Sequence, residues 1–198
     1  ASRIAFDASR LYQVPKDMTD EAAAILEPAT VAVHALRRTP LQLGDRAVVI
    51  GGGPIGLLVL QCAKAAGAGQ VVLLEPQAAR REMGLNLGAD VALDPTDESF
   101  QDLFAEQFPG GPDAVFECAG VPSTIGQSVS LVRRGGTVSL VGVANNVAEI
   151  NPAEWLIKEV KLTSSIAYQH EDFEICKDLV ASGRIQAEAL HTSTTNLA

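Results

Sequence analysis

The chain has 198 residues, 47% of them hydrophobic and 20% charged, a balance that is typical of a globular protein and too apolar for a disordered one. Its 15 basic and 24 acidic residues give a formal net charge of -9, which disfavours binding to nucleic acid or to anionic membranes. We see no apolar run of membrane-spanning length, no secretion signal and only three scattered cysteines, so we expect a cytoplasmic protein without disulfide bonds.

The first 38 residues differ in pattern from the rest of the chain. Residues 1–18 alternate in the manner of a strand and lead to a proline, and residues 19–38 predict a helix that is interrupted near Pro28. Asp20 and Glu21 favour a helix start just after Thr19.

From residue 45 onward, short β-rich runs alternate with helical stretches. We predict strands over residues 46–50, 70–74, 91–93, 113–117, 137–141 and 161–165. Helices are expected over residues 55–66, 78–87, 98–107, 123–132, 153–158 and 172–181. Several strands are nearly continuous apolar runs, as a parallel sheet covered on both faces requires. The predicted fold is therefore α/β, a doubly wound six-stranded parallel sheet of the Rossmann type.

A glycine-rich turn follows the first of these strands. Gly51, Gly53 and Gly56 match G-x-G-x-x-G at the point where a strand ends and a helix begins. In this motif the first glycine permits a sharp turn, the second lets a pyrophosphate approach the backbone, and the third lets the helix pack on the strand. Pro54 suits the first helical turn, whose N–H groups, Ile55 among them, would face the diphosphate.

An acidic residue ends the second predicted strand, as dinucleotide binding requires. Glu75 lies nineteen residues after Gly56, where a carboxylate can accept hydrogen bonds from the adenosine ribose. The same carboxylate would repel the 2′-phosphate of NADP, so we expect NAD. Arg80 and Arg81 leave NADP open, since either could pair with a phosphate, or both could lie on the solvated face of a helix. Arg80 is included among the expected cofactor-binding residues.

Further strand ends should complete the site, because ligands of such sheets lie across the carboxyl ends of the strands. The candidates are Cys118 and Ala119 after the fourth strand, Gly142 and Val143 after the fifth, and Ile166 after the sixth. A cysteine can be a nucleophile. With no histidine near it in sequence, we interpret this one as a small buried residue on the adenosine side.

Five motifs together resemble the medium-chain dehydrogenase/reductase superfamily, and within it the zinc-dependent alcohol and polyol branch with sorbitol and threonine dehydrogenases. They are LEPATVAVHALRR (26–38), GGGPIG (51–56), LLEPQAARREMGLNLGAD (73–90), FECAGVP (116–122) and RRGGTVSLVGV (133–143). The resemblance implies an NAD-dependent oxidation of a small alcohol or polyol, in which a catalytic zinc polarises the substrate hydroxyl. It also implies that Glu27, in the LEP motif, lies beside that zinc.

The other zinc ligands of this branch have no counterpart in the chain. The sequence contains no G-H-E motif and no group of closely spaced cysteines. His34 could share a helical face with Glu27, but a lone histidine there is more often packed or hydrogen-bonded. The remaining histidines and cysteines are scattered, so we expect no catalytic zinc here, with Glu27 as the one residue that could contact it in a full-length enzyme.

The resemblance also predicts a division into domains. Residues 28–186 correspond to the NAD-binding Rossmann domain. Residues 1–27 and 187–198 correspond to remnants of a GroES-like catalytic domain, and we expect the chain to be a fragment that binds cofactor without turning over substrate. Two alternatives remain open: a zinc-free, NADPH-linked enzyme of the quinone reductase type, against which Glu75 and the LEP motif argue, and a non-catalytic NAD-binding module.

Assembly is the last expectation. Residues 147–150 alternate in the manner of a short exposed strand, and an unpaired strand at a sheet margin tends to find a partner. The resemblance implies a homodimer joined edge to edge through Val147–Ile150, with a tetramer as a further possibility for the full enzyme. A plain surface loop is the alternative.

Overall fold

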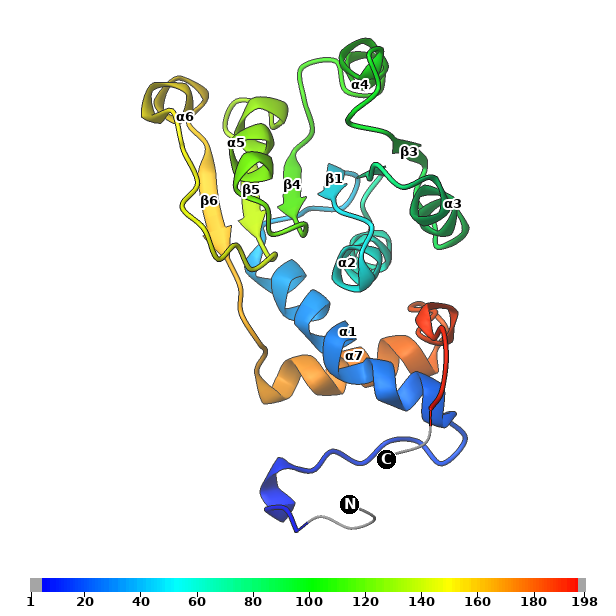
Figure 1. Cartoon of the computed structure of the whole chain (residues 1–198). Helices are drawn as coiled ribbons and strands as arrows, with labels where there is room; N and C mark the ends of the chain where they lie inside the picture. The colour runs from blue at the N-terminus through cyan, green and yellow to red at the C-terminus, as the bar shows by residue number, and fades with distance from the viewer. Residues whose placement is uncertain (1–4, 196–198) are drawn as a thin grey trace.

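A single parallel sheet organises the chain, for which a computed structural model describes residues 5–195. All five strand pairs are parallel and the strand order is β3-β2-β1-β4-β5-β6. The order reverses between β1 and β4, which is where ligands of this fold lie. The strands are β1 (Arg46–Ile50), β2 (Gln70–Leu74), β3 (Val91–Leu93), β4 (Ala114–Glu117), β5 (Thr137–Leu140) and β6 (Lys161–Ser164) (Figure 1).

Helices connect these strands and cover the sheet. They are α1 (Asp20–Arg38), α2 (Pro54–Ala65), α3 (Ala78–Asn86), α4 (Phe100–Gln107), α5 (Pro122–Leu131), α6 (Pro152–Lys158) and α7 (His170–Ala181), with short 3-10 helices η1 (Ala8–Arg10) and η2 (Glu188–Leu190). Across residues 5–195, no helix combines the length and the apolar character that crossing a membrane would need.

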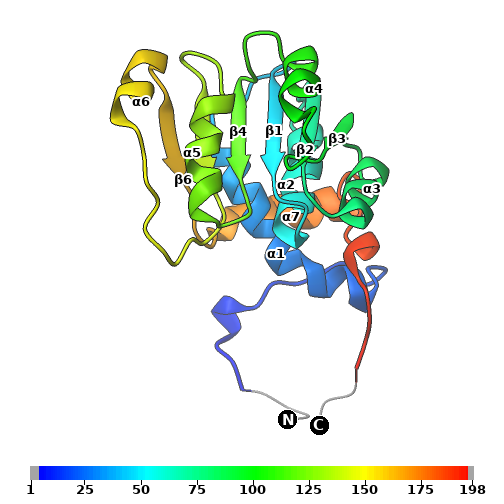
Figure 2. The same ribbon diagram turned by 45° about the horizontal axis from the view of Figure 1, so that its top comes forward.

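Alternate residues of the central strands bury against opposite faces of the sheet. Val49 of β1 packs in a cluster with residues of α1, α2 and α7. Its neighbour Val48 packs in a second cluster with residues of α4 and α5. Figure 2 shows α5 in front of the strands and α1 with α7 behind them. The apolar runs of the sequence therefore reflect two-sided burial, and the predicted α/β fold is confirmed.

The expected interruption near Pro28 is wrong, because α1 is continuous from Asp20 to Arg38. Thr19 caps it by accepting a hydrogen bond from the N–H of Ala22. Pro28 cannot donate to the carbonyl of Ala24, but Ala24 lies exposed, where water can bond that carbonyl. A stripe of buried residues on the opposite side secures the helix: Ala22, Leu26, Ala29, Thr30, Ala32, Val33 and Ala35.

Two stretches with strand-like patterns form no strand in the described part of the chain. Residues 5–18 contain only η1 as a regular element. Residues 1–4 and 196–198 lie outside the described part. Val147–Ile150 belongs to an irregular segment between β5 and α6, although Val147 is 91% exposed. A strand needs a neighbour to pair with, and the neighbour expected for residues 147–150 belongs to a second copy of the chain.

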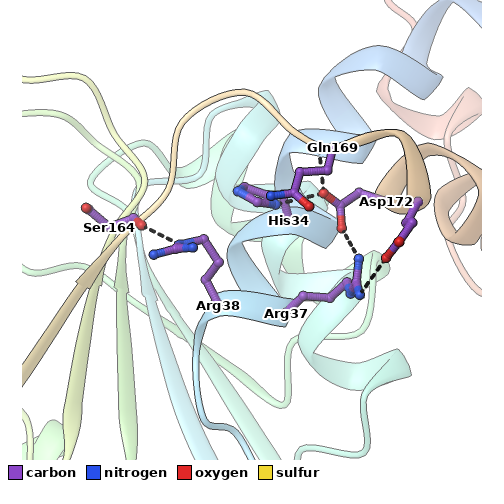
Figure 3. A network of polar contacts seen from close by, with 7 residues as sticks. His34, Arg37, Arg38, Ser164, Gln169 and Asp172 are labelled. Carbon is purple, nitrogen blue, oxygen red and sulfur yellow. Dashed lines mark hydrogen bonds and ion pairs between the residues drawn. The ribbon is translucent and has the colours of Figure 1, made fainter.

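A buried carboxylate joins α1 to α7. Figure 3 shows His34 and Arg37 of α1 directed at Asp172 of α7. Asp172 accepts from Arg37 Nη1 at 2.5 Å and from the N–H of Gln169 at 2.7 Å, and its Oδ2 lies 2.7 Å from His34 Nδ1. Burial opposes ionisation of Asp172, yet these partners hold its pKa below the ordinary value of 3.8.

Removing this carboxylate should loosen the helix pair. We expect Asp172→Ala to lower the free energy of unfolding by about 3 kcal/mol, because the part-buried His34 ring and the N–H of Gln169 both lose their hydrogen-bond acceptor. Denaturant titration measures it. The matched control is Glu171→Ala, since Glu171 is 76% exposed and lies 3.4 Å from the same arginine. The control should cost less than about 1 kcal/mol, and equal losses would contradict the role of Asp172.

Wild type and Asp172→Ala should also differ in how the free energy of unfolding depends on pH. A carboxyl group whose folded-state pKa is depressed stabilises the fold above its unfolded-state pKa, and this stabilisation is lost as the pH falls through the folded-state pKa. The difference between wild type and Asp172→Ala should therefore be full at about pH 5 and shrink below 3.8.

Candidate functional site

The glycine turn after β1 lies against the loop after β4. Gly51 has φ +101°, a conformation that L side chains rarely adopt, and a Cβ there would come within 3.0 Å of the backbone nitrogen of Ala119. A Cβ on Gly56 would stand 1.9 Å from the carbonyl oxygen of Gly51. Both glycines are therefore required by the backbone packing itself, whatever the turn binds.

Gly53 differs, because the space in front of it is open. No heavy atom lies within 4 Å of a Cβ built on Gly53. Gly53 is also the N-cap of α2, makes no side-chain capping bond, and is followed by Pro54 at the helix start. The first turn of this twelve-residue helix thus presents N–H groups at an open surface, an arrangement that suits a diphosphate.

The carboxylate of Glu75 lies beside the glycine turn. Glu75 directly follows β2, is only 3% exposed, and accepts from the N–H groups of Gly52 and Gln77. Arg80 Nη1 lies 4.0 Å from Glu75 Oε2, and the Arg80 side chain is 48% exposed. Arg81 points elsewhere, since its Nη1 pairs with Asp94 at 3.0 Å. Of the two arginines that the sequence left as alternatives, only Arg80 faces the site.

A pocket of about 500 Å³ at the carboxyl ends of β1, β2 and β4 brings six expected site residues together. Its polar lining residues are Glu75, Gln77, Arg80, Thr96, Thr124 and Gln127. Pro54, Ile55 and Gly56 belong to the same turn but do not line this pocket. The six expected residues that do are Gly51, Gly53, Glu75, Arg80, Cys118 and Ala119.

The other expected residues line a second pocket, of about 700 Å³, at the ends of β5 and β6. Gly142, Val143 and Ile166 lie there together with His34 and Arg38 of α1. Arg38 Nε donates to the carbonyl of Ser164 at 3.0 Å, which fixes α1 beside the end of β6 (Figure 3). The first pocket spans the point where the strand order reverses, between β1 and β4, and the second lies beyond it, at β5 and β6.

Cys118 is not an activated nucleophile. Burial, with a further contribution from the negative charge of Glu117, raises the pKa of the Cys118 thiol. A thiol with a raised pKa stays protonated and unreactive. The structure thus supports a packing role for this side chain in the wall of the first pocket.

Glu117 is a site residue that sequence reasoning missed. It ends β4, is fully buried, and its Oε1 accepts from the N–H groups of Ala119 and Gly120 and from the hydroxyl of Thr124. Within the described residues its Oε2 has no hydrogen-bond partner. Glu117 thereby fastens the loop that forms one wall of the first pocket. The only signal in the sequence was an acidic residue at the end of an apolar strand.

Glu27 is exposed on α1, near the segment that follows β6. Burial raises the pKa of the Tyr168 phenol, and the negative charge of Glu27 adds to the effect. In residues 5–195 no three histidine, cysteine, aspartate or glutamate side chains form a cluster that could hold a metal ion.

Comparison with known proteins gives consistent matches. The profile of a family described as zinc-binding dehydrogenase matches residues 54–182. The (R,R)-butanediol dehydrogenase of Bacillus subtilis is 35% identical over 191 residues, which are 96% of this chain and 54% of that protein. Human sorbitol dehydrogenase is 31% identical over 189 residues, 94% of this chain and 53% of that enzyme. The chain thus spans about half the length of these relatives.

Solved structures agree with the sequence relatives. A zinc-binding dehydrogenase from Sinorhizobium meliloti, bound to NADP, superposes with a TM-score of 0.80 and 34% identity over 88% of this chain and 52% of that one. An alcohol dehydrogenase from Escherichia coli, complexed with NADH, gives a TM-score of 0.87 and 25% identity over 93% of this chain and 55% of that one.

Proposed function

Because the chain belongs to the zinc-binding dehydrogenase family, we propose that it binds NAD(H) and forms the cofactor-binding half of a longer, zinc-dependent alcohol or polyol dehydrogenase. The observation that carries this proposal is the buried carboxylate of Glu75 beside the open surface of Gly53, in one pocket. The names of the butanediol and sorbitol dehydrogenases support a small alcohol or polyol as the substrate.

Each pocket takes one end of the cofactor. At Gly53, the N–H groups at the start of α2 would bind the oxygens of the diphosphate. Glu75 accepts hydrogen bonds from the ribose hydroxyls, with Cys118 and Ala119 as the opposite wall. The second pocket, with Gly142, Val143 and Ile166, takes the nicotinamide end. The bound nicotinamide supplies the hydride acceptor, while the chain orients it and excludes water from its inner face.

Glu75 also supports NAD over NADP. A phosphate on the ribose 2′-oxygen would approach a buried carboxylate, and such a like-charge contact costs several kcal/mol. Arg80 offsets part of this repulsion because its guanidinium lies 4.0 Å from Glu75. The NADP found on the Sinorhizobium relative makes a direct comparison of both cofactors necessary.

The first test is calorimetric titration of this chain with NADH and NADPH. We expect NADH to bind at least about tenfold more tightly, since about 1.4 kcal/mol of repulsion suffices for that ratio. Glu75→Ala should weaken NADH binding more than NADPH binding, whereas Glu82→Ala, on the exposed side of α3, should change neither. Tighter binding of NADPH by the wild type, or zinc-stimulated alcohol turnover by this chain alone, would contradict the proposal.

We propose that Glu27, on α1, lies beside the zinc of the longer protein. We also propose that residues 28–186 form the cofactor-binding domain and that residues 1–27 and 187–198 belong to the catalytic domain. The boundary at residue 27 falls within one continuous helix. A shared helix would couple the two domains mechanically. The cytoplasmic location is likewise proposed, supported by three free cysteines, and an export signal in the longer reading frame would contradict it.

In the longer protein, Glu27→Ala should lower activity or zinc content severalfold and leave the Kd for NADH within about twofold, because the residue lies outside both cofactor pockets. Glu21→Ala, an exposed acid six residues earlier on the same helix, is the control and should change neither quantity. Metal analysis and calorimetry measure the two effects. Loss of NADH affinity in parallel with activity would instead assign Glu27 to the cofactor site.

We also propose a homodimer that forms beside β6. All but one of the four β6 residues are exposed, and Leu162 is 45% exposed at this sheet edge. Val147, Leu156 and Ile157 add exposures of 91%, 78% and 72% nearby. An unpaired edge with apolar neighbours favours association, and a two-fold axis lets one patch satisfy its copy. A tetramer of the longer enzyme would build on this dimer.

Paired substitutions test the interface. Ile150 and Leu85 are each 48% exposed, at opposite margins of the sheet. We expect Ile150→Lys to shift dimers to monomers in light scattering across a concentration series, and Leu85→Lys to leave them unchanged. Ile150→Pro should act similarly if the segment pairs through its backbone. A wild type that stays monomeric at high micromolar concentration would refute the interface.

A further inference from the structure

Gly52 occupies the variable position of the glycine motif, so the motif itself does not explain why a glycine is there. Its backbone conformation does not require one either, since its φ lies outside the left-handed region. The reason lies in its surroundings. A Cβ on Gly52 would come within 2.9 Å of Cγ, 3.1 Å of Oε2 and 3.2 Å of Cβ of Glu75.

A Cβ on Gly52 would therefore contact Cβ and Cγ of Glu75 as well as its carboxylate. Glu75 is only 3% exposed, so its stem cannot swing freely to make room. The Gly52 N–H also donates to Glu75 Oε2 at 2.7 Å, while the N–H of Gln77 donates to Oε1 at 2.9 Å. The carboxylate is thus clamped between two backbone donors, and each oxygen keeps a lone pair for a further donor.

We infer that Gly52 is a positioning residue for cofactor choice: its N–H and its missing side chain hold the Glu75 carboxylate where it accepts ribose hydroxyls and repels a 2′-phosphate. The inference rests on the proposed binding of NAD(H). An alanine at this position pushes the carboxylate out of the clamp and toward the exposed Arg80, whose Nη1 is 4.0 Å away. Glu75 would then form an ion pair with Arg80 instead of accepting hydrogen bonds from the ribose hydroxyls.

The experiment compares Gly52→Ala with Gly53→Ala. A Cβ on Gly53 meets no heavy atom of the protein within 4 Å, so this control would obstruct the diphosphate, which NADH and NADPH share. Calorimetry gives the Kd of each variant for both cofactors. We expect Gly52→Ala to lower the preference for NADH over NADPH at least about tenfold. Gly53→Ala should weaken both cofactors and change the preference less than about twofold.

A double variant tests whether Gly52 acts through Glu75. In the background of Glu75→Ala, adding Gly52→Ala should change the preference less than about twofold, because the group that it displaces is gone. The inference is overturned by a Gly52→Ala variant that weakens both cofactors equally, or by a shift that persists without Glu75. A wild type without preference for NADH would instead refute the proposed cofactor, before any variant is considered.

Folding of the variants is checked by circular dichroism and thermal melting. Should Gly52→Ala fail to fold, the double variant provides the answer. Glu75→Ala removes the Cγ and the carboxylate that the new methyl group would strike, so the double variant should regain a cooperative melt. A double variant that also fails to fold, while Glu75→Ala alone folds, would overturn the inference.

Discussion

The start of α2 rests directly on the backbone of the turn that precedes it. The 1.9 Å between a Cβ on Gly56 and the carbonyl of Gly51 leaves no room for any side chain, and Gly51 in turn touches the loop after β4. This contact brings the end of β1, the start of α2 and the end of β4 to one place. The open surface of Gly53 and the first pocket both depend on it.

Two buried glutamates complete this arrangement in the same way, one on each side of β1. Glu75 directly follows β2 and Glu117 ends β4, and each carboxylate accepts hydrogen bonds from backbone N–H groups of the loop after its own strand. Glu75 additionally reaches across to the glycine turn. Charged hydrogen bonds of this kind fix loops that apolar packing alone would leave mobile. The pocket is therefore shaped by polar contacts at its rim and by apolar strands beneath.

Sequence patterns predicted the parts of this structure that depend on local periodicity. All six strands and the helices between them were expected within two residues of their observed ends, because apolar runs and glycine punctuation are local signals. Pro28 was misjudged, since only the tertiary contacts of α1 show that the helix is held in spite of it. Residues 147–150 form no strand within one copy of the chain, because alternation does not supply the neighbouring strand with which a strand must pair.

The site was predicted less completely than the fold. The glycine turn and Glu75 carry a motif, so their neighbourhood could be foreseen. Which of two adjacent arginines faces the pocket depends on the Arg81–Asp94 pair, thirteen positions apart, and no pattern reveals it. Glu117 was missed because its partners are backbone groups, which every residue has.

A hydrogen bond from the Thr19 hydroxyl to Glu188 joins positions that are 169 residues apart. The whole sheet and its helices are thus enclosed between an entry point and an exit point that touch. A unit of this kind can be placed inside a loop of another domain with little distortion of that domain, since its two connection points are close enough for their side chains to be hydrogen-bonded. The sheet and its helices could therefore be inserted into another protein as one unit. Joining Thr19 to Glu188 by a short linker would permit circular permutation.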